Sequence, residues 1–103
     1  MAGMFKGYTL RYDELFEAQL NAIASARHMD EALIGVEWIL SNEPEKCPVV
    51  PGTTRLRVIK TEPYRRNLVE IPALRIWFSI EDGGIVLMRA IDVIEDWDAP
   101  DNQ

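Results

Sequence analysis

The side chains best suited to chemistry in this sequence are basic residues gathered in its second half. Six of them lie between positions 55 and 75, against only two acidic residues, Glu62 and Glu70. Guanidinium and ammonium groups bind phosphates and carboxylates. Because the chain carries a net charge of −6, this segment either contacts an acidic partner or pairs with the chain's own carboxylates. The six residues are Arg55, Arg57, Lys60, Arg65, Arg66 and Arg75.

Arg75 lies inside a segment whose apolar residues alternate as in a strand buried on one face. The alternation places Arg75 and Trp77 together on the opposite face. An arginine beside a tryptophan predicts a recognition surface that works by stacking or by pairing with phosphate. The alternative is that Arg75 pairs with a neighbouring carboxylate while Trp77 covers the sheet. The alternating apolar residues are Leu74, Ile76, Phe78 and Ile80.

The turn after this strand decides the direction of Arg89. Asp82-Gly83-Gly84 supplies the positive-φ residues that a hairpin needs. A turn of three residues places Arg89 opposite Trp77, on the face of Arg75. A turn of two residues points Arg89 toward the core, where an unpaired charge is costly. We therefore expect three residues in the turn and include Arg89 in the candidate partner-binding surface.

Other reactive side chains give no catalytic or metal-binding pattern. His28 is the only histidine, and Cys47 lies in a proline-rich stretch with no histidine near it in sequence. A metal site or a nucleophile needs partners that the sequence does not place beside them. The chain also has no glycine-rich phosphate loop and no Cys-x-x-Cys motif. We expect no catalytic residue, no metal and no cofactor.

The composition indicates one domain without a membrane anchor. At 103 residues, with 48% hydrophobic residues, the chain suffices for one core of two packed layers. Its apolar runs are far shorter than the roughly 18 residues of a membrane span. The N-terminus lacks a hydrophobic signal core, and the single cysteine cannot form an intramolecular disulfide. We therefore expect a cytoplasmic protein.

The first half of the chain predicts a strand and two helices. Residues 7–11 are typical of a short strand, and Asp13 then caps a helix that runs to about Arg27. Asp30 caps a second helix, which ends before Pro44. That second helix is apolar over more than half of its circumference, so we expect it to be buried deeply or on two sides. The short break between the helices predicts an antiparallel hairpin.

The second half predicts strands. Residues 54–61 alternate arginines with Leu56 and Val58, as in a half-solvated strand, and 62–71 is expected to be an exposed loop. The hairpin at 73–94 completes the sheet, and an acidic tail begins at about Glu95. The expected fold is α+β. An N-terminal strand and an antiparallel helical hairpin precede a three-stranded antiparallel meander, and the helices pack on one face of the sheet.

This order of elements and the 73–87 stretch resemble the RelE/ParE superfamily of bacterial type II toxins, across most of the chain from about Tyr8 to Val93. Arg75 and Phe78 match the arginine and the terminal aromatic residue of the family signature, and Tyr8–Tyr12 resembles its first strand. The resemblance implies a single RelE/ParE-like domain over residues 1–103. It also implies a toxin-antitoxin system, with an antitoxin or a protein target as the partner.

The chain departs from the ribonuclease members of that family at its C-terminus. They typically carry a basic residue after the last strand and then a tyrosine, whereas this chain has Glu95, Asp96 and Asp98 there. Carboxylates repel an RNA backbone, and the net negative charge argues against broad nucleic-acid binding. We therefore expect a toxin-like protein-interaction domain that binds a protein target or antitoxin without catalysis.

Two alternatives remain open. One is an mRNA endoribonuclease that uses Arg57, Arg75 and Arg89 on phosphates. The other is a stand-alone homodimeric α+β module with no toxin activity. Its interface would be the sheet face away from the helices, which we expect to carry Trp77, Leu87 and Ile91.

Overall fold

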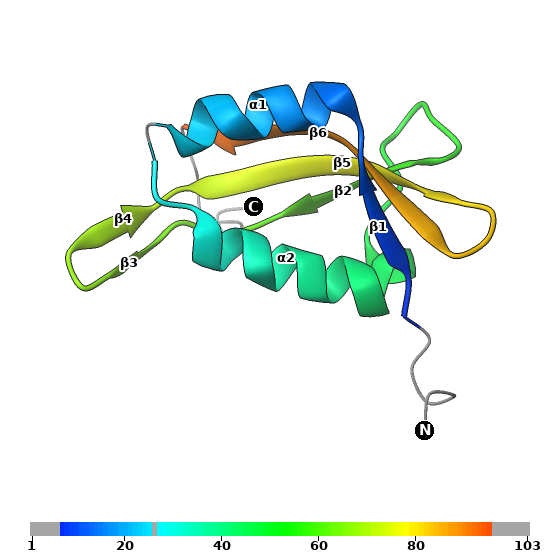
Figure 1. The fold of residues 1–103 in the computed structure, drawn as a ribbon. Helices are drawn as coiled ribbons and strands as arrows, with labels where there is room; N and C mark the ends of the chain where they lie inside the picture. Colours follow the sequence, from blue (N-terminus) through cyan, green and yellow to red (C-terminus); the bar gives the residue numbers. More distant parts are fainter. Residues whose placement is uncertain (1–6, 26, 96–103) are drawn as a thin grey trace.

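The computed structural model describes residues 7–25 and 27–95; most of the expected acidic tail lies outside them. The fold is α+β, as the sequence predicts. Two long helices and a short 3₁₀ turn, η2, separate the first strand from the other five (Figure 1). The elements are β1 (Thr9–Tyr12), α1 (Glu14–Ala24), α2 (Asp30–Asn42), η2 (Pro44–Lys46), β2 (Leu56–Lys60), β3 (Tyr64–Arg66), β4 (Val69–Ile71), β5 (Ala73–Glu81) and β6 (Ile85–Ile94).

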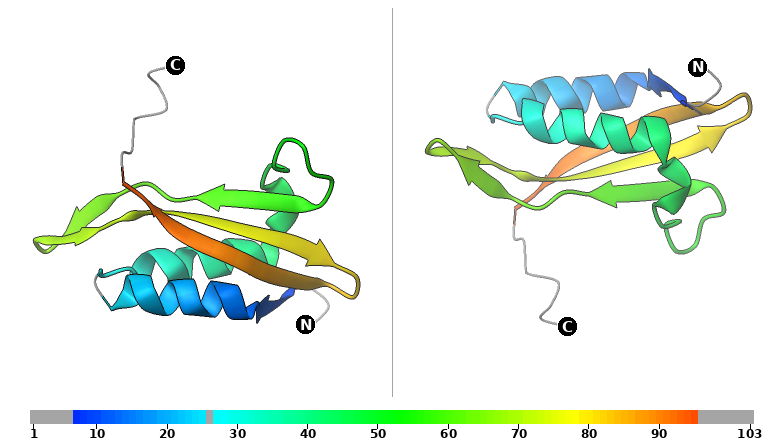
Figure 2. Two further views of the ribbon diagram at one scale, coloured as in Figure 1. Left: turned by 90° about the horizontal axis from the view of Figure 1, so that it is seen from above. Right: turned by 90° about the horizontal axis from the view of Figure 1, so that it is seen from below.

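The main sheet has four strands in the order β1-β6-β5-β2. Strands β2, β5 and β6 form the expected antiparallel meander, and β1 joins its end in parallel with β6. Both helices lie on the same face of this sheet, and the opposite face carries no helix in the part of the chain described (Figure 2). We call that opposite side the outer face. The arrangement places the core between the helices and the sheet.

The core is apolar and closely packed. Phe16 from α1, Leu40 from α2 and Phe78 from β5 are each fully buried in it. The N-cap of α1 agrees with the sequence, because the Asp13 carboxylate accepts a hydrogen bond from the Leu15 N–H at 3.1 Å. The helix ends at Ala24, before the expected end at about Arg27. Helix α2 has Met29 rather than Asp30 at its N-cap. Burying these aromatic and aliphatic side chains supplies the main driving force for folding.

The segment 62–71 is a second hairpin rather than a plain loop. Strands β3 and β4 pair antiparallel, with Arg65 opposite Glu70. The turn between them uses positive φ at Asn67 (54°) and Leu68 (69°), as a type I′ turn requires. Glycine or asparagine normally marks both positions of such a turn, and a leucine gives no such signal. The expectation of a loop here was therefore wrong.

Helix α2 is buried on one side only, which corrects the expectation of deep or two-sided burial. Ala32, Val36 and Leu40 face the core. Ile34 and Trp38, on the opposite side of the helix, are 65% and 63% exposed. Apolar residues wrap around this helix in sequence, but the domain supplies packing partners for only one of its faces.

A β-bulge in β6 changes the predicted register. The turn holds three residues, as expected, since Glu81 pairs with Ile85. Past Met88, however, the pairing shifts, so Trp77 lies opposite Ala90 and Arg89 has no residue opposite it. The extra residue turns Ile91 toward the helices, where it is 1% exposed. Ile91 is therefore not on the outer face, contrary to the expectation for the homodimer interface.

Candidate functional site on the outer sheet face

The outer face has an apolar centre flanked by charged residues. Cross-strand pairing places Val58 of β2 and Ala90 of β6 on either side of Trp77 in β5. Arg75, two residues before Trp77 in β5, lies between Lys60 of β2 and Asp92 of β6 in the same way. The face thus combines a partly exposed tryptophan with a short row of charges.

Arg75 is held in place by two contacts on this face. Its guanidinium donates to both Asp92 carboxylate oxygens, at 3.0 and 3.3 Å. It also lies 5.1 Å from the centre of the Trp77 ring, in a cation–π contact. The pairing with a carboxylate that the alternative interpretation expects is therefore present, and the recognition surface stays a prediction. Its charge is already compensated and its position is constrained.

An open pocket of about 460 Å³ crosses the middle of the outer face. It runs from Leu56 on β2, past Trp77, to Leu15 in the first turn of α1. Arg89 lines the pocket from the bulge, 3.8 Å from the Asp13 carboxylate. The bulge thus brings Arg89 beside Trp77, although the two residues do not face each other across the strands.

The six basic residues between positions 55 and 75 do not form one patch. Lys60 ends β2, and Arg55 directly precedes this strand and pairs with Glu81 at 3.6 Å. Arg65 and Arg66 lie on the β3–β4 hairpin and pair with Glu70 at 2.5 Å and with Glu31 at 2.8 Å, respectively. Pairing within the chain, one of the two interpretations, thus accounts for most of these charges.

Arg57 is turned away from the outer face. It lies opposite the buried Phe78, so its side chain is on the helix side of β2. There it donates to the backbone oxygens of Glu45 at 3.1 Å and Cys47 at 2.6 Å. The same pairing places Leu56 and Val58 on the outer face. The alternation in sequence is the same in either case, so only the pairing with β5 shows which set faces outward.

Sequence reasoning missed Leu56, Asp13 and Asp92 as parts of this surface. Asp13 was assigned only as a helix cap, and it also pairs with Arg89. Asp92 is directly opposite Arg75 in the register observed. A strand alignment that included the bulge would have found Asp92, but neither glycine nor proline marks the bulge in the sequence.

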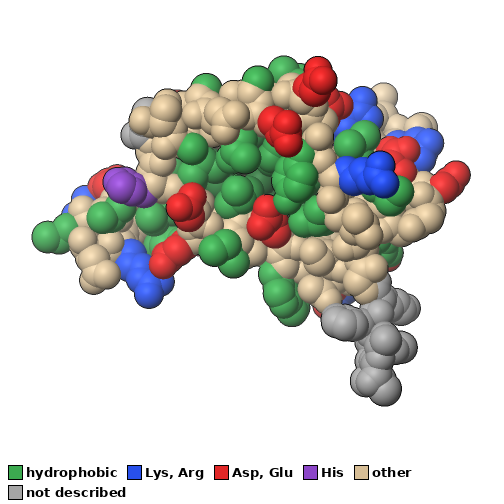
Figure 3. All heavy atoms as spheres, viewed as in Figure 1, with side chains coloured by type: hydrophobic (Ala, Val, Ile, Leu, Met, Phe, Trp, Pro, Cys, Tyr) green, Lys and Arg blue, Asp and Glu red, His purple; other side chains and the backbone are tan. Residues whose placement is uncertain are grey.

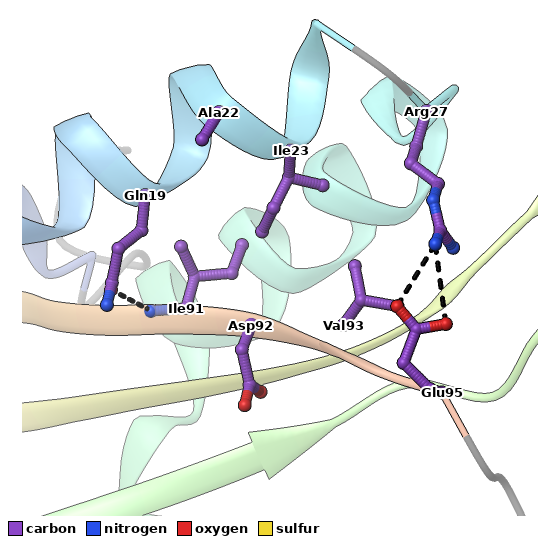
Figure 4. Close-up of a pocket in the computed structure, with 8 residues that line it drawn as sticks. All are labelled: Gln19, Ala22, Ile23, Arg27, Ile91, Asp92, Val93 and Glu95. Carbon is purple, nitrogen blue, oxygen red and sulfur yellow. Dashed lines mark hydrogen bonds and ion pairs between the residues drawn. The ribbon is translucent and has the colours of Figure 1, made fainter.

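A second pocket, of about 490 Å³, lies between α1 and β6 (Figure 4). Strand β1 ends opposite Met88, so the edge of β6 beyond this point has no strand beside it in the described chain. The side-chain oxygen of Gln19 accepts a hydrogen bond from the Ile91 N–H at 2.9 Å. This bond satisfies one of the backbone N–H groups along the edge of β6. Arg27 and Glu95 pair at 3.0 Å across one end of the pocket.

Titratable groups with shifted pKa values lie outside the outer-face pocket. Burial raises the pKa of the Tyr12 hydroxyl to about 12, and its hydrogen bond to Glu37 acts in the same direction. Burial also raises the pKa of the Cys47 thiol, which the charge of Arg57 partly opposes. A raised pKa disfavours the thiolate and hence a nucleophilic role. His28 lines a separate hollow of about 260 Å³ near Arg66.

Two further properties concern the described residues as a whole. Within 7–25 and 27–95, no group of three or more histidine, cysteine or acidic side chains is placed to hold a metal ion. No helix in the same ranges is long and apolar enough to cross a membrane. In comparisons with known proteins, no protein-family model and no curated protein matches this chain.

Proposed function

We propose that this chain is a toxin-like protein-interaction domain of a type II toxin-antitoxin system. In this proposal its outer face binds a protein target or an antitoxin, and the domain catalyses nothing. The observation that carries the proposal is the pocket beside Trp77, with apolar walls from Leu56 and Ala90 and a paired charge, Arg89, at its rim. Trp77 is partly exposed, and an accessible aromatic centre surrounded by polar groups is typical of protein–protein interfaces.

The charges on this face favour a protein over an RNA backbone. Cleavage of RNA needs cations free to take the phosphate and a group that moves the 2′-hydroxyl proton. Arg75 and Arg89, two cations of the ribonuclease alternative, pair with Asp92 and Asp13, and the third, Arg57, binds backbone oxygens on the other side of the sheet. The carboxylates would repel a phosphate, whereas protein interfaces readily accommodate such paired charges at their rims.

Inducible expression in a bacterial host tests the proposal. We expect the unaltered chain to arrest growth while cellular mRNA stays intact on a northern blot. Trp77→Ala should relieve the arrest, because it removes the aromatic anchor of the face. Tyr64→Ala, which removes a more exposed aromatic residue from β3, should retain it. Circular dichroism of both purified variants checks that they fold.

Two results would overturn the proposal. Cleaved mRNA would favour the endoribonuclease alternative. Normal growth at high soluble expression would exclude both toxin functions and favour the stand-alone homodimeric module.

A further inference from the structure

Helix α2 carries an exposed apolar stripe that the domain does not cover. Ile34 and Trp38 are four residues apart, so they lie one above the other on the same side of the helix. Each of the two residues is more than 60% exposed. Hydrophobic side chains protrude along α2, and acidic side chains border them (Figure 3). Adjacent large apolar residues on the solvent side of a helix are typical of a surface that another molecule covers.

Gly35 lies beside these two residues and is also exposed. A methyl group built at Gly35 would meet no atom within 4 Å, and its backbone is ordinary helix. Neither the fold nor the backbone therefore requires glycine here, although glycine weakens the middle of a helix. A missing side chain does allow the backbone of another element to approach closely. Gly35 thus indicates a close-packed neighbour on this side of α2.

The charges of α2 show which kind of neighbour fits. The helix contains Asp30, Glu31 and Glu37 and no lysine or arginine. Of these three carboxylates, only Glu31 forms an ion pair within the described residues, with Arg66 at the N-terminal end. A second copy of the chain would place two acidic helices against each other, which like charges oppose. A basic partner would instead complement them.

We propose that Ile34, Gly35 and Trp38 dock an amphipathic helix of another protein, with lysine or arginine beside its apolar face. Apolar side chains of that helix cover Trp38 and Ile34, its backbone passes over Gly35, and its cations face Asp30 and Glu37. Recognition of this kind is the packing of one helix against another. The site is separate from the outer face, because α2 covers the opposite side of the sheet.

Calorimetric titration of the full chain with model peptides tests the proposal. The probe is an 18-residue amphipathic peptide of leucine and lysine, and the matched peptide has glutamate at every lysine. We expect the lysine peptide to bind and the glutamate peptide not to bind. Trp38→Ala should weaken binding at least tenfold, as expected for an aromatic anchor. Equal binding of both peptides, or no effect of Trp38→Ala, would refute the proposal.

Ile34→Glu separates specific docking from general charge attraction. It adds a negative charge, so charge attraction alone would strengthen binding of the lysine peptide, whereas loss of the apolar stripe should weaken it at least tenfold. The control is Leu68→Glu, which adds the same charge at the hairpin tip, where Leu68 is 89% exposed. This control should keep the affinity within twofold or increase it.

Gly35→Ala should change stability and binding in opposite directions, which a role of Gly35 in the fold alone cannot produce. Alanine favours the helix, so the urea midpoint of the free chain should rise. Binding of the lysine peptide should nevertheless weaken several-fold, because the new methyl group prevents close approach. Unchanged or tighter binding would contradict docking over Gly35. Sedimentation velocity tests the other occupant. If the chain forms a dimer that Ile34→Glu dissociates, the stripe binds a second copy of the chain and the proposal of a basic partner is wrong.

These measurements do not depend on growth arrest. Failure of the docking proposal therefore leaves the proposed function unaffected, and failure of the proposed function leaves the docking proposal unaffected.

Discussion

At the scale of single residues, paired charges define the candidate site. Arg75 has its guanidinium against Asp92 and its plane near Trp77. The pair is only partly buried, with side-chain exposures of 35% and 46%, so it adds little stability. Its main effect is to orient Arg75 and to cancel its charge. A face with a compensated arginine binds proteins more readily than phosphates.

Asp92→Asn should therefore change binding more than stability. We expect the free energy of unfolding in urea to fall by no more than about 1 kcal/mol. Binding of a single-stranded RNA oligonucleotide, followed by fluorescence anisotropy, should rise because Arg75 loses its carboxylate partner. Glu70→Gln is the matched control, since it removes the same charge beside Arg65 on the hairpin. Equal gains for both variants would mean that Asp92 does not specifically restrain Arg75.

Tyr12 should make stability depend on pH in the alkaline range. Its folded pKa of about 12 lies above the ordinary value of 10.0, so folding favours the protonated hydroxyl. This contribution is complete below pH 10 and is lost as the pH rises toward about 12. Tyr12→Phe should flatten the fall in unfolding free energy over that interval, and urea titrations at several pH values measure it. An unchanged slope would contradict the raised pKa.

At the scale of elements, the β3–β4 hairpin contains one residue, Leu68, that is unfavourable at its position in the turn. Leu68 adopts φ of 69° at the second turn position, where a side chain is strained. It is also 89% exposed, so its burial offers little compensation. The hairpin forms nevertheless, because β3 and β4 pair and Arg66 joins it to Glu31 of α2.

Leu68→Gly should stabilise the protein. Relief of the left-handed strain should raise the free energy of unfolding by roughly 1–2 kcal/mol. The greater freedom of glycine in the unfolded chain should lower it by about 0.5–1 kcal/mol. We expect a net gain of about 0.5–1 kcal/mol in urea unfolding. Ile34→Gly, at a similarly exposed position inside α2, should instead destabilise by about 1 kcal/mol. A loss of stability with Leu68→Gly would mean that its side chain is needed.

At the scale of the whole molecule, a single core joins both helices to the sheet. Phe16, Leu40 and Phe78 come from α1, α2 and β5, and all three belong to one buried cluster. The exposed apolar stripe of α2 and the outer face of the sheet lie on opposite sides of this core. The two surfaces that we propose for binding therefore do not overlap.

Phe78→Ala should weaken the whole domain rather than the sheet alone. Removing a buried phenylalanine costs about 3–5 kcal/mol, a large part of the roughly 5–15 kcal/mol that stabilises a domain. Helix content by circular dichroism and tryptophan fluorescence should be lost together at a lower urea concentration. Leu15→Ala, at a residue that is 54% exposed, should shift the midpoint much less. Helices that persist after the fluorescence change would contradict a single core.

By itself, the sequence determined the features that depend on neighbouring residues. Asp13 caps α1, Pro44 begins the short turn after α2, and Asp82-Gly83-Gly84 forms a three-residue turn. The alternation around Arg75 also predicted strand β5 and placed Trp77 on the same face. Such features are local, because caps, turns and strand periodicity arise from contacts within a few residues.

Only the tertiary structure decided which residues meet from distant segments. The bulge at Arg89 moved Ile91 into the core and placed Asp92 opposite Arg75. Pairing of β2 with β5 put Arg57 on the helix side. The exposed side of α2 likewise depends on where the sheet lies. The physical reason is that register and burial depend on packing between distant segments, and one extra residue in a strand shifts the face of every residue after it.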